Sequence, residues 1–506
     1  MHISCIRLLA ALALLPLGGL SAQAAIPGFP GTPICPPNSS CAPGTPTPPG
    51  TCGPGNAGAT CTNRGPAIIG GSSGINLGAG NPINVINGNK YGREVDMAPL
   101  PGTLGLEIIR HYNSSLSGSG ASTNLVGRGW KLSYETDLYV SGRTVQIVQA
   151  DGSRIIFNRD PRDPSLCASA DPANGTVSIV KTNRGDEYTW RWTNGRQLSF
   201  DSKGKLVQIL APGGLFVSLR YDPAGLLTRV TDPQGRRLDL SYPSREQARA
   251  GDAFRGVQSI ASPVGRFTYH YGSAMAAGAD IDKRLLLANL VKVSMPVGAR
   301  TYHYEQADRP TLLTGISELV NGKAGKAAWQ RIATYGYDIN GKANLSVRGW
   351  PARLARGADG KPLQPARLAD GTGIGQVTLE YGKGETVVAN SQGRQTVFRH
   401  AILAGEYRLL EVRGAGCSGC GETNVRYAYD ELARLQTTTR LSATGEPLSS
   451  ERQEYDRRGR LASVSDIAYT RGKALPARLK LRYEYEADAA YPARILRPAW
   501  FPAVST

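Results

Sequence analysis

The stretch YDPAGLLTRVTDPQGRRLDLSY, residues 221–242, decides the fold of this chain. It begins with a Tyr-Asp pair, passes through a short turn that contains glycine, and continues in residues of high strand propensity. Asp tolerates turn geometry and can bond the backbone two residues further on, and Gly adopts a positive φ at no steric cost. The stretch therefore predicts a strand, a tight turn and a second strand, which together form a β-hairpin.

The motif recurs along the chain, which indicates a scaffold built from one unit many times. Its copies are Tyr221-Asp222, Tyr337-Asp338, Tyr429-Asp430, Tyr455-Asp456 and a variant with Phe, Phe200-Asp201. Helical periodicity is scarce, and its only modest candidates are residues 244–252 and 281–291. The sequence predicts an all-β protein made of repeated β-hairpins.

A second repeat, residues 262–272 and 295–305, shares Pro-Val-Gly followed by Tyr-His-Tyr. The two tyrosines of each copy fall at period two and should share one face of a strand. His270 and His303 then point to the opposite face. We interpret both as surface or half-buried strand residues, and the alternative is a metal or catalytic role.

The chain opens with the features of a secretory signal. Arg7 provides a basic start, residues 8–20 form an apolar run, and residues 22–24 (Ala-Gln-Ala) provide a small-residue cleavage site. The apolar run is too short to span a bilayer. We expect export to the periplasm, the cell surface or the medium, with no transmembrane segment in the mature chain.

Residues 25–72 are rich in Pro, Gly, Ser and Thr, a composition that cannot bury a core and predicts an extended linker. The linker carries four cysteines: Cys35, Cys41, Cys52 and Cys61. In an oxidising compartment we expect two disulfides, with the connectivity left open. A zinc site is the alternative, although the spacings are wide and the segment has no His.

The sharpest chemical motif is residues 417–420, Cys-Ser-Gly-Cys. Such a pair can form a local disulfide, half of a zinc site or a redox dithiol. Redox catalysis favours a helix N-terminus and zinc requires a second pair, whereas the surroundings predict a β-turn. We favour a disulfide between Cys417 and Cys420, which leaves Cys167 as the unpaired thiol.

Further motifs precede the hairpins and resemble a known family. They are NPINVINGNKYGREVDM (81–97), LGLEIIRHYNS (104–114) and GRGWKLSYE (127–135), followed by residues 151–157 and 189–206. In this order they are similar to the domain that precedes the repeats in bacterial Rhs proteins, and the Tyr-Asp units resemble the YD repeat of the same family. The family also includes wall-associated proteins, insecticidal toxin-complex subunits and animal teneurins. Roughly residues 75–465 carry the resemblance.

The resemblance implies that the hairpins coil into a hollow β-shell. In bacteria such shells enclose a toxic C-terminal domain, and elsewhere the family is linked to carbohydrate binding and cell contact. The family's closing Asp-Pro-x-Gly segment has no counterpart near the C-terminus, since residues 232–235 (Asp-Pro-Gln-Gly) lie within a repeat and predict an ordinary turn. The expected organisation is a signal (1–24), a linker (25–72), an Rhs-type N-terminal β domain (73–160), a YD-repeat region (161–480) and an irregular C-terminal end (481–506).

The sequence shows no nucleophile elbow, metalloprotease motif or phosphate-binding loop. The Tyr-Asp carboxylates could serve glycoside chemistry, but a reaction needs one arrangement and these recur, so a turn role is favoured. We predict no catalytic residue, metal or cofactor.

The leading functional hypothesis is an exported, non-enzymatic Rhs scaffold: a partial shell for toxin encapsulation or delivery, or for cell contact. The expected partners are a companion chain that completes the shell or a toxin domain. The alternative is a cell-surface or periplasmic module for acidic carbohydrate, suggested by the net charge of +18. The favoured interpretation of that charge is a solvated surface on which arginines flank the β-turns. No specific nucleic-acid partner is expected.

Overall fold

The computed structural model is built almost entirely of antiparallel β-strands, which confirms the predicted fold class. It describes residues 75–117, 123–152, 154–169, 174–192, 195–244, 246, 254–272, 283–321, 327–352, 373–403, 406–486 and 492–498, together with the backbone of 52–53 and 56–57. The helix α2 (Lys283–Leu287) lies within a range that the sequence marked as a modest helix candidate. Among the described residues, no helix is long and apolar enough to cross a membrane.

Four short strands, a 3-10 helix and a three-stranded sheet make up the N-terminal part. The elements are β1 (Cys52–Gly53), β2 (Asn56–Ala57), β3 (Gly78–Ala79), β4 (Ile83–Asn84), β5 (Tyr91–Met97), β6 (Ile108–Asn113), the 3-10 helix η2 (Ser114–Leu116) and β7 (Trp130–Leu132). Strands β5, β6 and β7 pair antiparallel in that order. This is the small β domain that the sequence predicted before the repeats.

The remaining strands form one sheet of 29 strands in chain order. Its first half contains β8 (Asp137–Ser141), β9 (Thr144–Val148), β10 (Arg154–Arg159), β11 (Leu166–Ala168), β12 (Thr176–Thr182), β13 (Gly185–Arg191), β14 (Gln197–Phe200), β15 (Leu206–Leu210), β16 (Phe216–Tyr221), β17 (Leu227–Thr231), β18 (Arg237–Ser241), β19 (Ser259–Ser262), β20 (Gly265–Tyr271) and β21 (Leu290–Ser294). Its second half contains β22 (Ala299–His303), β23 (Gly315–Asn321), β24 (Ala327–Tyr337), β25 (Ala343–Arg348), β26 (Ile374–Tyr381), β27 (Glu385–Asn390), β28 (Gln395–Leu403), β29 (Glu406–Gly414), β30 (Val425–Tyr429), β31 (Leu435–Leu441), β32 (Pro447–Tyr455), β33 (Leu461–Thr470), β34 (Lys473–Ala474), β35 (Arg478–Glu484) and β36 (Arg494–Leu496).

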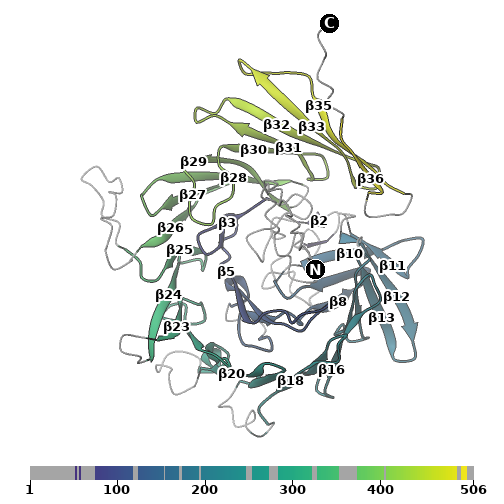
Figure 1. Ribbon diagram of the computed structural model, residues 1–506, viewed down its shortest axis with the longest axis vertical. Helices are drawn as coiled ribbons and strands as arrows, with labels where there is room; N and C mark the ends of the chain where they lie inside the picture. The colour runs from purple at the N-terminus through teal and green to yellow at the C-terminus, as the bar shows by residue number, and fades with distance from the viewer. Residues whose placement is uncertain are drawn as a thin grey trace, which may run out of the picture.

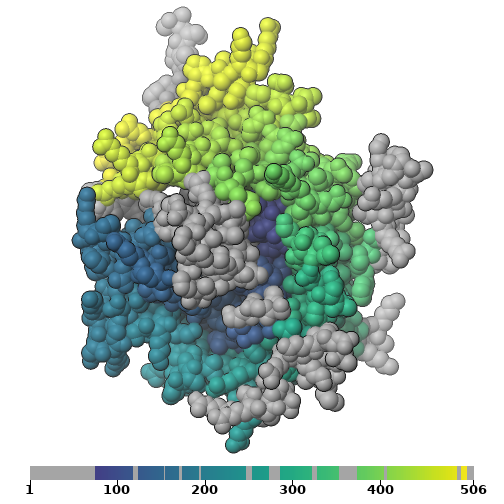
Figure 2. Space-filling model, turned by 180° about the vertical axis from the view of Figure 1, so that it is seen from behind, coloured from purple at the N-terminus to yellow at the C-terminus, as the bar shows by residue number. Residues whose placement is uncertain are grey.

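The sheet curls round on itself like the wall of a drum (Figure 1). The strand order is that of a ring in which β36 is followed by β8 and β9. Both views place the yellow C-terminal strands beside the blue strands at the start of the sheet (Figures 1 and 2). In the part of the chain that the structure describes, β36 pairs with β35 and β8 pairs with β9, and the Leu138 N–H of β8 also donates to the Gly204 carbonyl at 2.9 Å.

Two ranges expected from the sequence differ from the strands observed. Strands β8, β9 and β10 lie within residues 73–160, expected as the N-terminal domain, yet they pair into the large sheet. Residues 481–506, expected as irregular, contain the end of β35 and all of β36. In both places short strands of mixed composition form by pairing with a neighbouring strand. The local sequence does not predict that pairing.

The N-terminal sheet lies inside the ring, against the inner wall of the large sheet (Figure 1). The hydroxyl of Tyr112 in β6 accepts a hydrogen bond from the Leu313 N–H at 2.9 Å, across 201 residues of sequence. Figure 2 shows purple N-terminal residues within the ring, between blue, teal and green strands. The interior of the drum is therefore filled in part by the chain's own N-terminal strands.

One apolar core joins the two parts. It includes Tyr112 and Trp130 of the N-terminal sheet, together with inward residues of the wall such as Tyr269 and Tyr302. Alternation along the wall strands is clear, as in β20, where Phe267 and Tyr269 are buried and His270 is exposed. In this repeat Tyr269 thus faces the interior and His270 the opposite side, as the alternation in the sequence predicted.

Candidate functional site

Each Tyr-Asp aspartate lies at the first corner of a turn and accepts hydrogen bonds from the backbone of that turn. Asp456 Oδ1 accepts from the N–H groups of Arg458 and Arg460, both at 2.9 Å. The other copies accept the equivalent bond at the fourth residue of the turn, and they are Asp201, Asp222, Asp338 and Asp430. Burial alone would raise the pKa of Asp456, but the bonds from Arg460 and the turn amides outweigh it and lower the pKa.

The aromatic residue of the motif marks a bulge in the ladder. At Tyr221, for example, the register shifts by one, so that Tyr221 pairs with Leu227 across the turn. The same shift occurs at Phe200, Tyr337, Tyr429 and Tyr455. The bulge follows from the turn geometry, because a turn that ends in a positive-φ residue adds one residue to one strand.

The tyrosine hydroxyls connect each hairpin to an earlier strand of the sheet. Tyr455 donates a hydrogen bond to the Leu435 carbonyl at 2.7 Å, and Leu435 is the first residue after the previous Tyr-Asp turn. Equivalent bonds run from Tyr221 to Leu206, Tyr242 to Leu227, Tyr429 to Leu409 and Tyr485 to Leu461. Burial raises the pKa of Tyr221, so its phenol stays protonated and donates. The motif therefore joins consecutive units rather than lining a pocket.

A basic residue at the end of the turn completes the connection. Arg434 pairs with Asp430 of its own turn at 2.7 Å, and its guanidinium lies 4.5 Å from the ring centroid of Tyr455 in the next unit. Arg460 repeats the arrangement with Asp456 at 2.8 Å and with Tyr485 at 4.3 Å. These turn arginines are thus engaged by residues of the repeats themselves.

The two motif histidines lie apart from one another on the outer face. His303 Nε2 lies 2.8 Å from Ser317 Oγ, and burial lowers its pKa. His270 is exposed beside Lys292, and burial and that lysine lower its pKa. Among the residues that the structure describes, no group of three or more His, Cys, Asp or Glu side chains is placed to hold a metal ion.

A buried ion pair within the N-terminal sheet is bonded to two tyrosines of the wall, and the sequence motifs did not point to it. Arg110 of β6 and Asp96 of β5 lie 2.7 Å apart with both side chains fully buried. Arg110 also donates to the Tyr302 hydroxyl, while the Tyr269 hydroxyl donates to Asp96 at 3.0 Å. Burial alone would lower the pKa of Arg110, but Asp96 raises it well above its ordinary value. The sequence signal was present, since an arginine interrupts the apolar strand IIRHYN.

Trp130 of β7 covers the same ion pair. The Arg110 guanidinium lies 4.7 Å from the Trp130 ring centroid, and Trp130 packs edge-on against Tyr302 at 5.1 Å. The first tyrosine of each Tyr-His-Tyr repeat therefore recognises the N-terminal sheet. This explains why those residues recur at the inner face of β20 and β22.

Several other ionisable groups of the N-terminal sheet are buried. Burial lowers the pKa of Lys90 to about 7, against the opposing effect of Glu94, and its ammonium lies 4.3 Å from the Tyr335 ring centroid. Burial raises the pKa of Glu135 to about 7, although its carboxylate accepts backbone bonds and faces a lysine. Burial also lowers the pKa of His111 to about 3. Lys90 thus contacts the wall, whereas His111 and Glu135 have hydrogen-bond partners within the N-terminal part.

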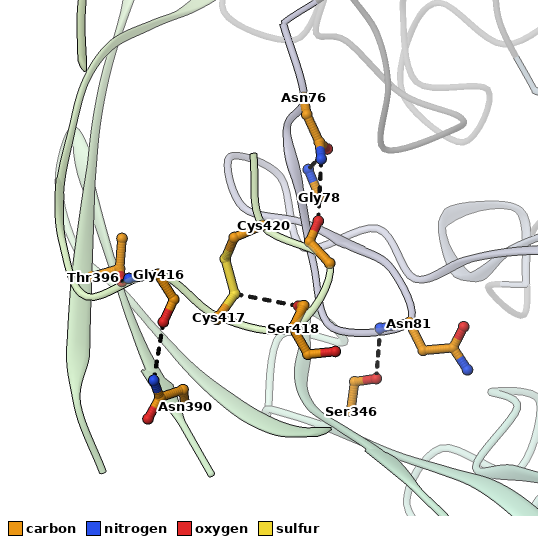
Figure 3. The surroundings of a disulfide bond; sticks show 11 residues. Asn76, Gly78, Asn81, Ser346, Asn390, Thr396, Gly416, Cys417, Ser418 and Cys420 are labelled. Atoms are coloured by element: carbon orange, nitrogen blue, oxygen red, sulfur yellow. Dashed lines mark hydrogen bonds between the residues drawn. A yellow bond between two sulfur atoms is a disulfide. The ribbon is translucent and has the colours of Figure 1, made fainter. Parts of the chain in front are cut away.

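The Cys-Ser-Gly-Cys motif is a turn between β29 and β30 (Figure 3). Cys417 and Cys420 are joined by a disulfide, and Cys167 is a buried free thiol whose pKa is raised by burial. The Gly80 N–H donates to the Ser418 carbonyl at 2.6 Å. Cys35, Cys41 and Cys61 lie outside the described residues, and only the backbone of Cys52 is described.

Two family models match the chain in the regions described above. The model described as RHS Repeat matches residues 200–237, and the model described as Domain of unknown function (DUF6531) matches residues 80–157. The first covers the three turns capped by Asp201, Asp222 and Asp232, and the second covers the N-terminal sheet and the first strands of the wall.

Individual relatives are distant and much longer. Double-stranded DNA deaminase toxin A of Burkholderia cenocepacia is 26% identical over 198 residues, which is 32% of this chain and 13% of that protein. The solved structure of TcdB2-TccC3 is 12% identical with a TM-score of 0.29, covering 75% of this chain and 21% of the other. The Tc holotoxin pore of Photorhabdus luminescens is 8% identical with a TM-score of 0.25, covering 82% and 28%. The chain spans a minor part of each of these proteins.

The family assignment rests on the repeat itself. The RHS Repeat match begins at Phe200, the aromatic residue of the first described turn of this kind, and ends after the turn at residues 232–236. The same bulge and aspartate cap recur at the later copies. The chain therefore carries the RHS repeat, the unit of the Rhs, or YD-repeat, family.

Proposed function

We propose that this chain is an exported, non-enzymatic Rhs scaffold whose curled sheet forms part of a shell, and that the shell takes part in enclosing or delivering a toxin. The observation that carries the proposal is a single sheet of 29 strands that winds round an interior. A wall of this kind separates what lies inside it from solvent. The last strands of the sheet, β35 and β36, are largely exposed, so we further propose that a companion chain completes the shell there.

The non-enzymatic part of the proposal rests on how the repeated residues are used. The aspartates cap turns and the tyrosines bond carbonyl groups of earlier strands. Groups committed to such bonds are poorly placed to act on a substrate. The deaminase activity in the relative's name belongs to that protein, and we do not transfer it.

Co-expression tests the enclosing role. The tagged chain would be produced together with the polypeptides encoded by adjacent reading frames, and the purified material treated with proteinase K before and after denaturation. We expect a companion polypeptide to co-purify and to resist the protease until the shell is unfolded. Purification of the chain alone, with every adjacent polypeptide in the unbound fraction, would argue against encapsulation.

Cell fractionation tests the proposed export. We expect the full chain in the periplasm or medium and a variant without residues 1–24 in the cytoplasm. If the full chain and the variant were distributed equally, the proposed export would be wrong, and the proposed shell would be unaffected.

The carbohydrate alternative has less support from the arrangement of charge. Arg434 and Arg460 are already paired with aspartates of their own turns, so these two basic side chains are engaged within the repeats. A glycan array at physiological salt distinguishes the two functions, since a passive scaffold should bind none of the acidic glycans.

A further inference from the structure

Residues 75–89, here called the N-terminal strap, cross the inner wall of the sheet before β5 begins. The Asn81 N–H donates to Ser346 Oγ at 3.0 Å, across 265 residues of sequence. Thr386 Oγ1 donates to the Val85 carbonyl at 2.6 Å, across 301 residues. The strap is therefore docked on β25 and β27, far from its own position in the chain.

The disulfide turn holds the beginning of the strap (Figure 3). The Ser418 carbonyl accepts the Gly80 N–H at 2.6 Å, and the Gly419 carbonyl accepts Asn76 Nδ2 at 3.1 Å. The approach is close, because a Cβ atom added to Gly419 would lie 2.1 Å from the Gly80 carbonyl oxygen. Both acceptors lie between the two cysteines, so their positions depend on the conformation that the disulfide closes.

The base of the turn is held by other contacts. The Gly416 N–H donates to Thr396 Oγ1 at 2.8 Å, and Asn390 Nδ2 donates to the Gly416 carbonyl at 3.0 Å. Between the cysteines, one backbone bond closes the turn, from the Cys420 N–H to the Cys417 carbonyl at 3.2 Å. Ser418 and Gly419 are exposed and the two cysteines are half-buried, so a small reductant can reach the sulfurs. Cleavage of the disulfide would free the tip of the turn and leave its base in place.

We propose that the Cys417–Cys420 disulfide is a redox-sensitive latch on the N-terminal strap. While the bond is intact, the carbonyl groups of Ser418 and Gly419 hold the strap at Gly80 and Asn76. A small dithiol such as dithiothreitol opens the latch: one of its thiolates attacks a protein sulfur, and its second thiol then displaces the mixed disulfide. The products are two cysteine thiols and the cyclic disulfide of the reagent, so two electrons and two protons pass to the protein.

Hydrogen exchange followed by mass spectrometry tests the latch on the full chain. Exchange of a peptide covering residues 76–82 would be measured with and without dithiothreitol, for the wild type and for Cys417→Ser/Cys420→Ser. We expect reduction to accelerate exchange of this peptide about 10-fold, because a short disulfide loop restricts the open ensemble by roughly that factor. The double variant should exchange at the fast rate under both conditions. A peptide at Thr386, on the wall, should not change.

Two results would overturn the latch. One is unchanged exchange at residues 76–82 after alkylation shows that both cysteines have been reduced. The other is an equal response of the double variant to dithiothreitol, which would assign the effect to other cysteines. If the double variant does not accumulate, Gly419→Ala replaces it. Its Cβ would push against the Gly80 carbonyl, and oxidised Gly419→Ala should show the same acceleration, whereas wild-type exchange rates in it would refute the latch.

Discussion

In each Tyr-Asp turn, the third residue after the aspartate adopts a positive φ. In YDPAGLL this residue is Gly225, with a φ of 79°, and a Cβ atom added there would meet nothing within 4 Å. In YDELARL the same position is Ala433, with a φ of 58°. An L-residue with a side chain pays roughly 1–2 kcal/mol for this conformation. The turn therefore accommodates alanine in place of glycine at position 433, because the hydrogen bonds to Asp430 hold its backbone.

Exchanging these two residues should change stability in opposite directions. Gly225→Ala should lower the free energy of unfolding by about 1 kcal/mol, from backbone strain alone, because the site has room for a methyl group. Ala433→Gly should raise it by less than about 0.5 kcal/mol, because the relief of strain is partly offset by the lost burial of the Ala433 methyl group and by the added freedom of the unfolded chain. Urea denaturation of both variants beside the wild type checks the signs. Two changes of the same sign would contradict this account of the turn.

At the scale of elements, β6 shows how the N-terminal sheet is attached. All six of its residues, IIRHYN, are buried, and Arg110 among them reaches its carboxylate partner on β5 and a tyrosine on the wall. A buried charge without its partner is far more costly than an absent pair. Loss of either partner of this ion pair should therefore destabilise the sheet where it meets the wall.

Removal of one partner should therefore be severe. Arg110→Met leaves Asp96 buried without its cation and should lower the free energy of unfolding by about 3–5 kcal/mol. Arg110→Met/Asp96→Leu should recover a large part of that loss. The matched control is Arg440→Met, whose partner Glu422 is half exposed, and which should cost less than about 1 kcal/mol. Chemical denaturation gives all three values, and a double variant as unstable as Arg110→Met would argue against an uncompensated charge.

Lys90, at the start of β5, predicts a pH dependence of stability. Burial lowers its pKa from 10.5 to about 7 in the folded protein, so between these values the unfolded chain binds a proton that the folded chain does not. Stability should then rise with pH from about 7 to 10.5, and the cost of charging Lys90 is complete below pH 7. The gain should amount to a few kcal/mol, since each pKa unit corresponds to about 1.4 kcal/mol.

The difference between the wild type and Lys90→Met isolates this contribution. Urea denaturation at intervals from pH 7 to 10 should show the variant more stable at pH 7, with the gap closing as the pH rises. A gap that stays constant across this range would show that Lys90 does not change its protonation on folding.

Across the whole molecule, burial falls from the interior sheet towards the C-terminal strands. Strand β6 is buried throughout, whereas most residues of β35 and all of β36 are exposed. Apolar residues there are exposed as well, among them Leu479 and Ile495. These last strands therefore have pairing within the sheet but little packing behind them.

Local stability should follow this gradient. Amide hydrogen exchange in β35 and β36 should be at least 100-fold faster than in β17 and β18, because few buried contacts oppose local opening there. Mass spectrometry of the native protein compares the two regions in one experiment. Equal protection would show that something further covers the C-terminal strands in solution.

The sequence by itself determined the repeating unit. Tyr, Asp and Gly at a constant spacing predict the turn because its geometry depends on residues close together in the chain, and the all-β class follows from the absence of helical periodicity. The disulfide between Cys417 and Cys420 was favoured on the same local grounds, from its spacing and its surroundings. The bulge at each motif aromatic was missed, since it depends on which strand lies across the turn.

Only the tertiary structure decided what the N-terminal residues contact. Arg110 contacts Tyr302, and Gly80 contacts Ser418, only because the sheet curls round. The curl brings strands hundreds of residues later in the chain next to the N-terminal residues. Such contacts arise from the accumulated twist and curvature of many strands, and no local pattern records that sum. The sequence therefore predicts the repeating β-hairpin, and the folded ring determines which residues the hairpins enclose.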